Sequence, residues 1–480
     1  MPSEMNSRIS GATRWSFASG GVGLGVFQNA HYFVLIFYNQ VLGLSGSLTG
    51  LALAVGLILD AVAAPLVGFL SDNWKSRLGR RHPFLYAAIL PSLVFYFLLW
   101  HPPGTIESEL ALFAYLVVCN IGLRLGMTLF TVPAYAIVAE ITSDYDERTR
   151  LVGYLTAAYS VFNNGMSMIM YAVWLVPTPE VSDGILNQAG YEEAGLVGAV
   201  LIGLSMTGFA FGLHRYIARL REYRNEASLS PRDFLGQARD VFQDASLRAL
   251  GVAGIIYYAA SGTYAVLWVY IYSFFWEFSS QDLSLLVIPM VLSGVALLPL
   301  VSRVTFGREK KKMAILMFVG AALVNALPIL ARLMGLFPEN GSDTLFWIMM
   351  GAGFFETLLF LLLDSLLVSM TSDLTEQNEL KTGRRNEGVI LSTLSFLQKC
   401  AGALGTLLGG LIIDWIAFPE DAVVGEVDPE VLFDLGIAYG PLILGLYLVA
   451  SLFIGGYRIS RDVHSATLAE LRANAEQDDH

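Results

Sequence analysis

Five acidic or basic residues lie deep inside long apolar segments of this 480-residue chain. Asp60 stands within GLILDAVAAP, Arg124 and Lys399 lie in two other apolar segments, and Glu356 and Asp364 share a fourth. Glu356 and Asp364 are eight residues apart, about two helical turns, so they share one face of a helix. Ionisable groups at membrane depth are costly and usually functional. Groups of opposite charge can pair in one conformation and separate when a cation or a solute competes for them.

Twelve apolar runs are long enough to cross a hydrocarbon core of about 30 Å as helices. The composition agrees, because 15% of the residues are charged, whereas soluble domains have about 25%. The predicted fold class is an all-α integral membrane protein with twelve transmembrane helices in two six-helix bundles. The approximate helix cores are 17–42, 47–70, 84–100, 110–138, 151–176, 195–213, 249–275, 284–302, 313–334, 345–370, 388–413 and 436–456.

Lysine and arginine fall almost entirely in alternate loops, and the loops between hold acids. Basic residues in short loops mark the cytoplasmic side, so both termini are predicted to be cytoplasmic in a multi-pass protein of the cytoplasmic (inner) membrane. The net charge of −12 then reflects the outer loops. The polar N-terminus lacks the pattern of a signal peptide, and nucleic-acid binding has no support.

The longest polar connection divides six predicted spans from six. We expect an N-terminal bundle over 1–214, a cytoplasmic linker over 215–248 with a short amphipathic helix, and a C-terminal bundle with a short tail over 249–480. Ser230-Pro231 in the linker is a typical helix start. The tail is predicted to be an exposed helix.

The loop after the second apolar run carries a specific pattern, Gly68-x-x-x-Asp72 followed by Arg77-x-Gly79-Arg80-Arg81. It resembles the motif of the major facilitator superfamily. The lengthened form SDNWKSRLGRRHPF resembles the glycoside–pentoside–hexuronide cation symporter branch, which is melibiose-carrier-like. Three further stretches are similar to that branch: LDAVAAPLVG over 59–68, AEITSDYDERTRL after Pro133, and DLTEQNELKTGRRNE over 373–387 with Lys399 twelve residues beyond.

Asp72 beside an arginine-rich loop can bond helix N-terminal amides and guanidinium groups. Such a cluster is a latch that bundle motion must break, and Gly79 permits the tight turn that aims its neighbours differently. The alternative is that these basic residues serve topology alone. The predicted cytoplasmic gate consists of Asp72, Arg77, Gly79, Arg80, Arg81, Glu140, Arg148, Asp373 and Arg385.

The resemblance also implies a cation site, which this chain matches in part. Asp60 occupies the first acid position, whereas Ala64 and Thr131 stand where two further acids are expected. A sodium site wants several oxygen ligands, but proton coupling needs one titratable group. We therefore assign cation coupling to Asp60, Thr131 and Lys399, with the proton favoured over uncoupled or sodium-coupled transport. A structural salt bridge from Asp60 to Arg124 or Lys399 is the alternative.

Polar and aromatic residues within the apolar runs are candidate solute ligands. Amides and hydroxyls hydrogen-bond polyols, and sugar rings stack on aromatic faces; purely structural hydrogen bonds and an interfacial aromatic belt are the alternatives. The predicted substrate-binding residues are Asn29, His31, Tyr32, Arg124, Tyr258, Trp268, Glu356, Asp364 and Gln398.

The resemblance implies a secondary transporter that works by alternating access, with its site at the midplane between the bundles. Its expected cargo is a sugar, glycoside or sugar acid with a proton or sodium ion; a lysolipid or other amphiphile, or uncoupled transport, is the alternative. The chain lacks HExxH, G-x-S-x-G and P-loop motifs, so no enzyme is expected. No cofactor or bound metal is expected. The protein is expected to be a monomer surrounded by membrane lipid.

Overall fold

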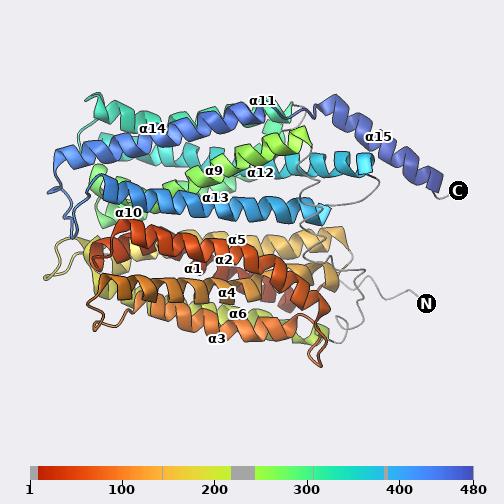
Figure 1. Cartoon of the computed structure of the whole chain (residues 1–480), viewed down its shortest axis with the longest axis horizontal. Helices are drawn as coiled ribbons and strands as arrows, with labels where there is room; N and C mark the ends of the chain where they lie inside the picture. Colours follow the sequence, from red (N-terminus) through yellow and green to blue (C-terminus); the bar gives the residue numbers. More distant parts are fainter. Residues whose placement is uncertain (1–8, 143, 218–243, 306–307, 383–386, 479–480) are drawn as a thin grey trace. The chain divides into compact units, whose positions relative to one another are not determined.

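A computed structural model describes residues 9–142, 144–217, 244–305, 308–382 and 387–478, and every regular element in these ranges is helical. The first half of the chain forms six long helices (Figure 1). Two of them, α1 and α5, each continue into a π-helical turn, Phe37–Val41 after α1 and Met170–Trp174 after α5. Their bounds are α1 Gly11–Ile36, α2 Gly46–Asn73, α3 His82–Trp100, α4 Glu109–Ile141, α5 Tyr145–Ile169 and α6 Gln188–Gly212.

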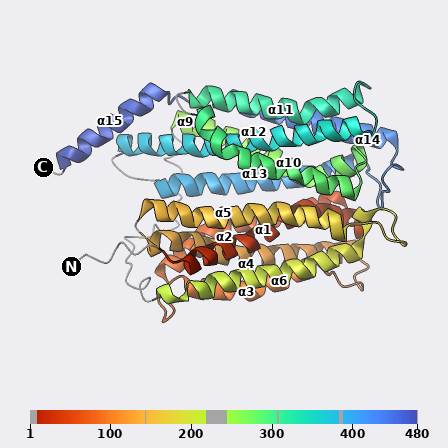
Figure 2. The same ribbon diagram turned by 180° about the vertical axis from the view of Figure 1, so that it is seen from behind.

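The second set of long helices occupies the green-to-blue half of the chain, and Figure 2 shows α10, α11 and α12 from behind. The bounds are α9 Ala245–Tyr270, α10 Ser280–Thr305, α11 Lys310–Leu333, α12 Asp343–Thr382, α13 Glu387–Trp415, α14 Pro429–Ile454 and α15 Arg461–Asp478. α9 also ends in a π turn, Ile271–Phe275.

The described residues divide into two compact units. Unit 1 contains residues 9–217 together with 279–287 and 418–424, and unit 2 contains 244–278, 288–417 and 425–478. Two short segments from the second half of the sequence therefore belong to the first unit. The predicted linker helix lies mostly within 218–243, outside the described residues.

Eleven of the described helices are long and apolar enough to cross a membrane. The twelfth expected span corresponds to α5, which is less apolar because it begins in the charged YDERTR stretch and later carries Asn163 and Asn164. α12 runs well past its predicted end near 370: its 40 residues extend about 60 Å, twice the thickness of a hydrocarbon core. The tail forms α15, a helix whose described side chains are mostly exposed, although Thr467 is buried.

Glycines set the closest helix contacts in each unit. In unit 1, side chains at Gly21 and Gly25 of α1 would meet the carbonyl oxygens of Leu155 and Tyr159 on α5. In unit 2, a Cβ at Gly405 of α13 would lie 1.9 Å from the carbonyl oxygen of Ala259 on α9. Gly21-x-x-x-Gly25 and Gly405-x-x-x-Gly409 have the small-residue spacing by which membrane helices approach closely.

Within unit 1, side chains hold a backbone segment that lies between α13 and α14 in the sequence. Gln40 donates from Nε2 to the carbonyl oxygen of Pro419 at 3.1 Å and accepts from the Ala422 amide at 3.0 Å. Asp183 accepts from the Val424 amide at 3.2 Å. Burial raises the pKa of Asp183, although its two amide donors oppose that rise. These bonds explain why 418–424 belongs to unit 1.

Replacing Gly405 by alanine is expected to lower the melting temperature of the detergent-purified protein. Alanine normally favours a helix over glycine by about 1 kcal/mol, but its methyl group at 405 has no room beside Ala259. Gly351 of α12 is exposed, with nothing within 4 Å of an added Cβ, so Gly351→Ala is the matched control. Equal melting temperatures for Gly405→Ala and wild type would show that α9 and α13 are not held this tightly.

Candidate functional site

A line of polar residues on α4 organises the interior of unit 1. Asn120, Arg124 and Thr128 are spaced by four, so they share one helix face. Arg124 is 8% exposed, and its Nε donates to Asn120 Oδ1 at 3.0 Å. Asn120 Nδ2 in turn donates to the Ala52 carbonyl oxygen of α2 at 2.9 Å. Thr128 Oγ1 donates to Asp60, also on α2.

This arrangement places opposite charges near one another. Asp60 interacts electrostatically with Arg124, while both keep neutral polar partners on α4. In a low-dielectric interior, charges persist when they are paired and hydrogen-bonded. The geometry is thus compatible with the predicted coupling role of Asp60 and equally with the alternative, a structural salt bridge to Arg124.

A cavity of about 90 Å³ adjoins Arg124 in unit 1. Gln28 and His31 of α1 line it with Asn120 and Arg124 of α4. His31 Nδ1 is buried and has no hydrogen-bond partner among the described residues. The Arg124 guanidinium carbon lies 5.7 Å from the centre of the Phe27 ring, so an aromatic face, a cation and an imidazole meet at this cavity.

Three of the predicted residues lie differently. Asn29 is 2% exposed and donates from Nδ2 to the Asn163 carbonyl oxygen and to Ser167 Oγ on α5, so it joins helices. Tyr32 is half-buried on the same helix. Thr131 is half-buried three residues beyond Thr128, and it is Thr128 that bonds Asp60. Asn120 and Thr128 were missed, although their spacing from Arg124 on α4 was a readable signal.

Unit 2 holds two carboxylates with hydroxyl and amide partners. Glu356 of α12 accepts from Asn325 Nδ2 of α11 at 2.6 Å. Two turns later, Asp364 accepts from the hydroxyls of Tyr257 and Tyr258 of α9 at 3.1 and 3.4 Å. Both acids therefore bond neighbouring helices of unit 2, and their eight-residue spacing places them on one face of α12.

A second cavity, of about 120 Å³, lies among α9, α12 and α13 in unit 2. Tyr258, Gln398, Ser395 and Thr371 supply its polar lining. Lys399 follows Gln398 on α13 and is half-buried. Trp268 is elsewhere, 6% exposed, with its ring stacked on Tyr272 at 4.3 Å between centroids.

Four of the predicted gate residues of unit 1 form an ion cluster. Arg80 Nη2 lies 2.7 Å and Arg81 Nε 3.0 Å from Glu140 Oε1 at the end of α4. Arg81 also contacts Asp72 and donates to Ser71 Oγ at 2.6 Å. All three members of the Arg80–Arg81–Glu140 group are at most 8% exposed.

The rest of the predicted gate is distributed differently. Gly79 adopts a φ of +76°, the left-handed conformation that favours glycine, and Arg77 before it is exposed and outside the cluster. Arg148 Nε donates to the Thr142 carbonyl oxygen at 2.7 Å. Arg385 lies outside the described residues.

Asp373 belongs to a corresponding cluster in unit 2. Lys310 at the start of α11 places Nζ 2.7 and 2.8 Å from its two carboxylate oxygens. Unit 1 pairs the start of α3 with the end of α4, and unit 2 pairs the start of α11 with α12. The same pairing thus occurs once in each unit.

Comparison with known proteins identifies the fold and the family. The family described as MFS/sugar transport protein matches residues 16–461. The structure of a D-xylose–proton symporter aligns with this chain over 92% of this chain and 96% of the symporter, with a TM-score of 0.64 and 14% sequence identity. At that identity the likeness concerns the fold.

Three curated relatives give the range of functions near this chain. The uncharacterised symporter sll1374 of Synechocystis sp. is 30% identical over 46% of this chain and 39% of its own length. The isoprimeverose transporter of Lactiplantibacillus pentosus is 23% identical over 81% and 76%. The sodium-dependent lysophosphatidylcholine symporter 1-B of Danio rerio is 28% identical over 40% and 37%. Against the first and third, the chain spans less than half of the relative.

Replacing Arg81 by glutamine is expected to lower the melting temperature, because Glu140 and Asp72 both lose a partner. Removing one member of a buried ion pair typically costs about 3–5 kcal/mol. Arg77→Gln removes the same charge from the same loop but touches no cluster, so it should melt like wild type. Thermal unfolding in detergent distinguishes the two, and equal losses would refute the cluster's role.

Proposed function

This chain belongs to the MFS/sugar transport protein family, and from that membership we propose that it carries a sugar, glycoside or sugar acid together with a cation. It is a transporter of the major facilitator type and not an enzyme. Alternating access would move both cargoes in one cycle. We place it in the cytoplasmic membrane as a monomer with both termini inside, the orientation that its basic loops predict.

The observation that carries this proposal is the cavity of unit 1, where four polar side chains join an otherwise apolar lining. An apolar helical bundle has no structural need for Arg124, His31 and Gln28 around one space. Among the described residues, Arg124 hydrogen-bonds Asn120 through Nε. Its two terminal nitrogens are therefore suited to a solute hydroxyl or carboxylate. A guanidinium can hold a carboxylate with two parallel bonds, which favours a sugar acid within the proposed class.

We propose Asp60 as the coupling residue and a proton as its cation. Thr128 supplies a hydroxyl beside this carboxylate. Ala64 and Thr131 stand where the resemblance implies two further acids, whereas a sodium ion prefers several oxygen ligands. Proton coupling needs only one titratable group, and Asp60 can supply it. Neutralising Asp60 would weaken its attraction for Arg124 and so link the cation to the solute cavity.

The ion clusters of the two units are proposed as gates. Arg81, Glu140 and Asp72 in unit 1 and Lys310 with Asp373 in unit 2 lie at the ends predicted to face the cytoplasm. Buried pairs of this kind favour one arrangement until a rearrangement separates them. Solute and cation binding would then bias the equilibrium between the two arrangements.

An amphiphile carrier is the second candidate. The Danio rerio relative, named for lysophosphatidylcholine and sodium, favours it, but it matches less than half of this chain. The isoprimeverose transporter matches 81% and so supports the sugar proposal more broadly.

Uptake by proteoliposomes tests the proposal directly. Labelled sugars, glycosides, sugar acids and lysolipids would each be offered under a proton gradient, a sodium gradient or neither. Accumulation of a sugar-type solute driven by protons is expected. Lysolipid movement without sugar uptake would replace the substrate class, and sodium-driven uptake would replace the coupling ion.

Asp60→Asn is expected to abolish proton-driven accumulation while leaving solute exchange at a measurable rate. The amide keeps the shape and can still accept from Thr128, but it cannot exchange a proton. Accumulation and exchange would be measured in the same vesicles, with Asp343→Asn as a control at an exposed acid. Wild-type accumulation by Asp60→Asn would remove this residue from the coupling mechanism.

Arg124→Gln is expected to weaken the binding of an acidic solute more than that of its neutral analogue. A hydrogen bond to a charged group contributes about 1.5–3 kcal/mol, which corresponds to roughly a tenfold or larger loss of affinity. Competition binding with a sugar acid and the parent sugar measures the difference. Arg332→Gln is the control, because Arg332 Nη1 bonds the Pro338 carbonyl oxygen. Equal losses for both solutes would exclude recognition of the carboxylate.

A further inference from the structure

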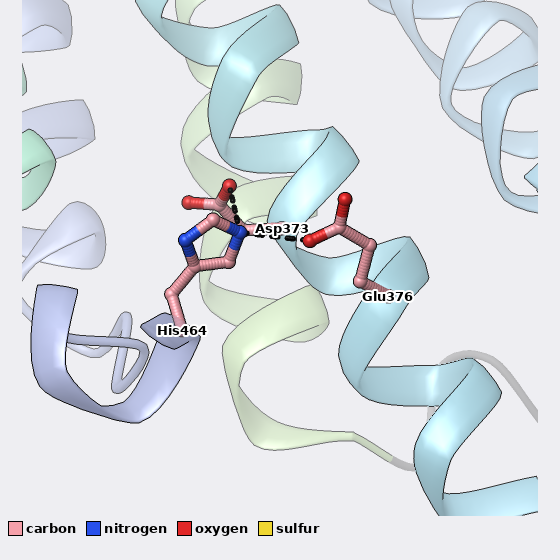
Figure 3. Close-up of side chains that lie close together, drawn as sticks. All are labelled: Asp373, Glu376 and His464. Carbon is pink, nitrogen blue, oxygen red and sulfur yellow. Dashed lines mark hydrogen bonds and ion pairs between the residues drawn. The ribbon is translucent and has the colours of Figure 1, made fainter. Parts of the chain in front are cut away.

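Unit 2 contains a second group of titratable residues where α15 meets α12. Asp373 and Glu376 are three residues apart and lie on one face of α12. His464, in the first turn of α15, directs one ring nitrogen at both carboxylates (Figure 3). His464 Nε2 is 2.7 Å from Glu376 Oε2 and 3.4 Å from Asp373 Oδ1.

The three side chains offer one ligand atom each within a small volume. The ligand atoms all lie within 4.8 Å of one another. Zinc bonds imidazole nitrogen and carboxylate oxygen at about 2.0–2.2 Å, which puts tetrahedral ligand atoms roughly 3.4 Å apart. The His464–Asp373 distance already has this value, and the shorter His464–Glu376 contact has to open by less than 1 Å.

Lys310 and Tyr457 hold the Asp373 carboxylate in place. Lys310 Nζ contacts both oxygens, and the Tyr457 hydroxyl donates to Oδ2 at 3.3 Å. Burial and the nearby Asp373 charge raise the pKa of Tyr457, so its hydroxyl keeps the proton that it donates. Partners of this kind orient a metal-ligating carboxylate.

The charges favour a divalent cation. Two carboxylates against one lysine leave a net negative charge of one when His464 is neutral, and a neutral imidazole is the form that binds metals. The side chains of His464 and Glu376 are 26% and 36% exposed, so an ion can reach them from solvent. A nitrogen ligand disfavours magnesium and calcium and suits zinc or a related transition metal.

We propose that Asp373, Glu376 and His464 form a binding site for a divalent transition metal, represented by Zn²⁺, that fastens α15 to α12. The bound ion would link α15 directly to α12. The chain just before α15 is already hydrogen-bonded to α9, since the Arg458 amide donates to Ser246 Oγ at 3.1 Å. Water would complete the coordination of a three-ligand site. This proposal is independent of which solute is carried.

The test uses the full-length protein in detergent, prepared without a polyhistidine tag, stripped with a chelator and then titrated with Zn²⁺ or Co²⁺. Elemental analysis gives the stoichiometry, and Co²⁺ visible absorption reports the ligand geometry. One ion per chain is expected. His464→Ala and the near-isosteric Glu376→Gln should each reduce the affinity by about 10-fold or more.

His101→Ala is the matched control, because His101 Nδ1 interacts with the Phe97 carbonyl oxygen away from acids. It should bind the metal like wild type. Size-exclusion chromatography checks that each variant is folded, and Glu376→Gln keeps the test open if His464→Ala aggregates. Absence of binding in wild type, or unchanged binding in both site variants, would overturn the proposal and leave an imidazole–carboxylate ion pair.

Discussion

In unit 1, α1 and α5 approach so closely that carbonyl oxygens of α5 occupy the space where side chains at Gly21 and Gly25 would stand. In unit 2, α9 and α13 do the same at Gly405. Lipid offers no hydrophobic driving force for helices to associate. Close contact at small residues stabilises the helix pairs instead, through van der Waals packing. α2 and α4 approach closely as well, since a Cβ at Gly56 of α2 would lie 2.1 Å from Asn120 Nδ2 of α4. This contact gives the buried charges defined neighbours, so that Arg124 meets Asn120 and Asp60 meets Thr128.

The two units share an ion pair between neighbouring helices, although the sequence around it differs between them. The motif that surrounds Asp72 and Arg81 has almost disappeared from the second half. A cation at the start of one helix still meets an acid near the end of the next, through Arg81 and Glu140 in one unit and Lys310 and Asp373 in the other. Charge at helix ends survives substitution of the loop between them, because only the position and sign of the partners matter.

Sequence reasoning placed the helices well, since long apolar runs have few alternatives in a membrane. Family membership and fold confirmed the resemblance drawn from the loop motif. Partners of the buried charges were harder, because periodicity says which face a residue occupies and not which helix lies opposite. Thr128 therefore replaces Thr131 beside Asp60, and Asn29 joins α1 to α5. The length of α12 was underestimated because hydropathy reports the membrane and α12 continues past it.

Segment 418–424 is held by Gln40 and Asp183 through its main chain alone: a carbonyl oxygen at 419 and amides at 422 and 424. Every amino acid has that carbonyl oxygen, and every one except proline has that amide. These three hydrogen bonds therefore ask nothing of the side chains at 419, 422 and 424 beyond the exclusion of proline at 422 and 424, whereas they require Gln40 and Asp183 themselves. In an alignment, these bonds would conserve Gln40 and Asp183, which lie far from the segment along the chain, while within the segment burial constrains Phe418 and Ala422.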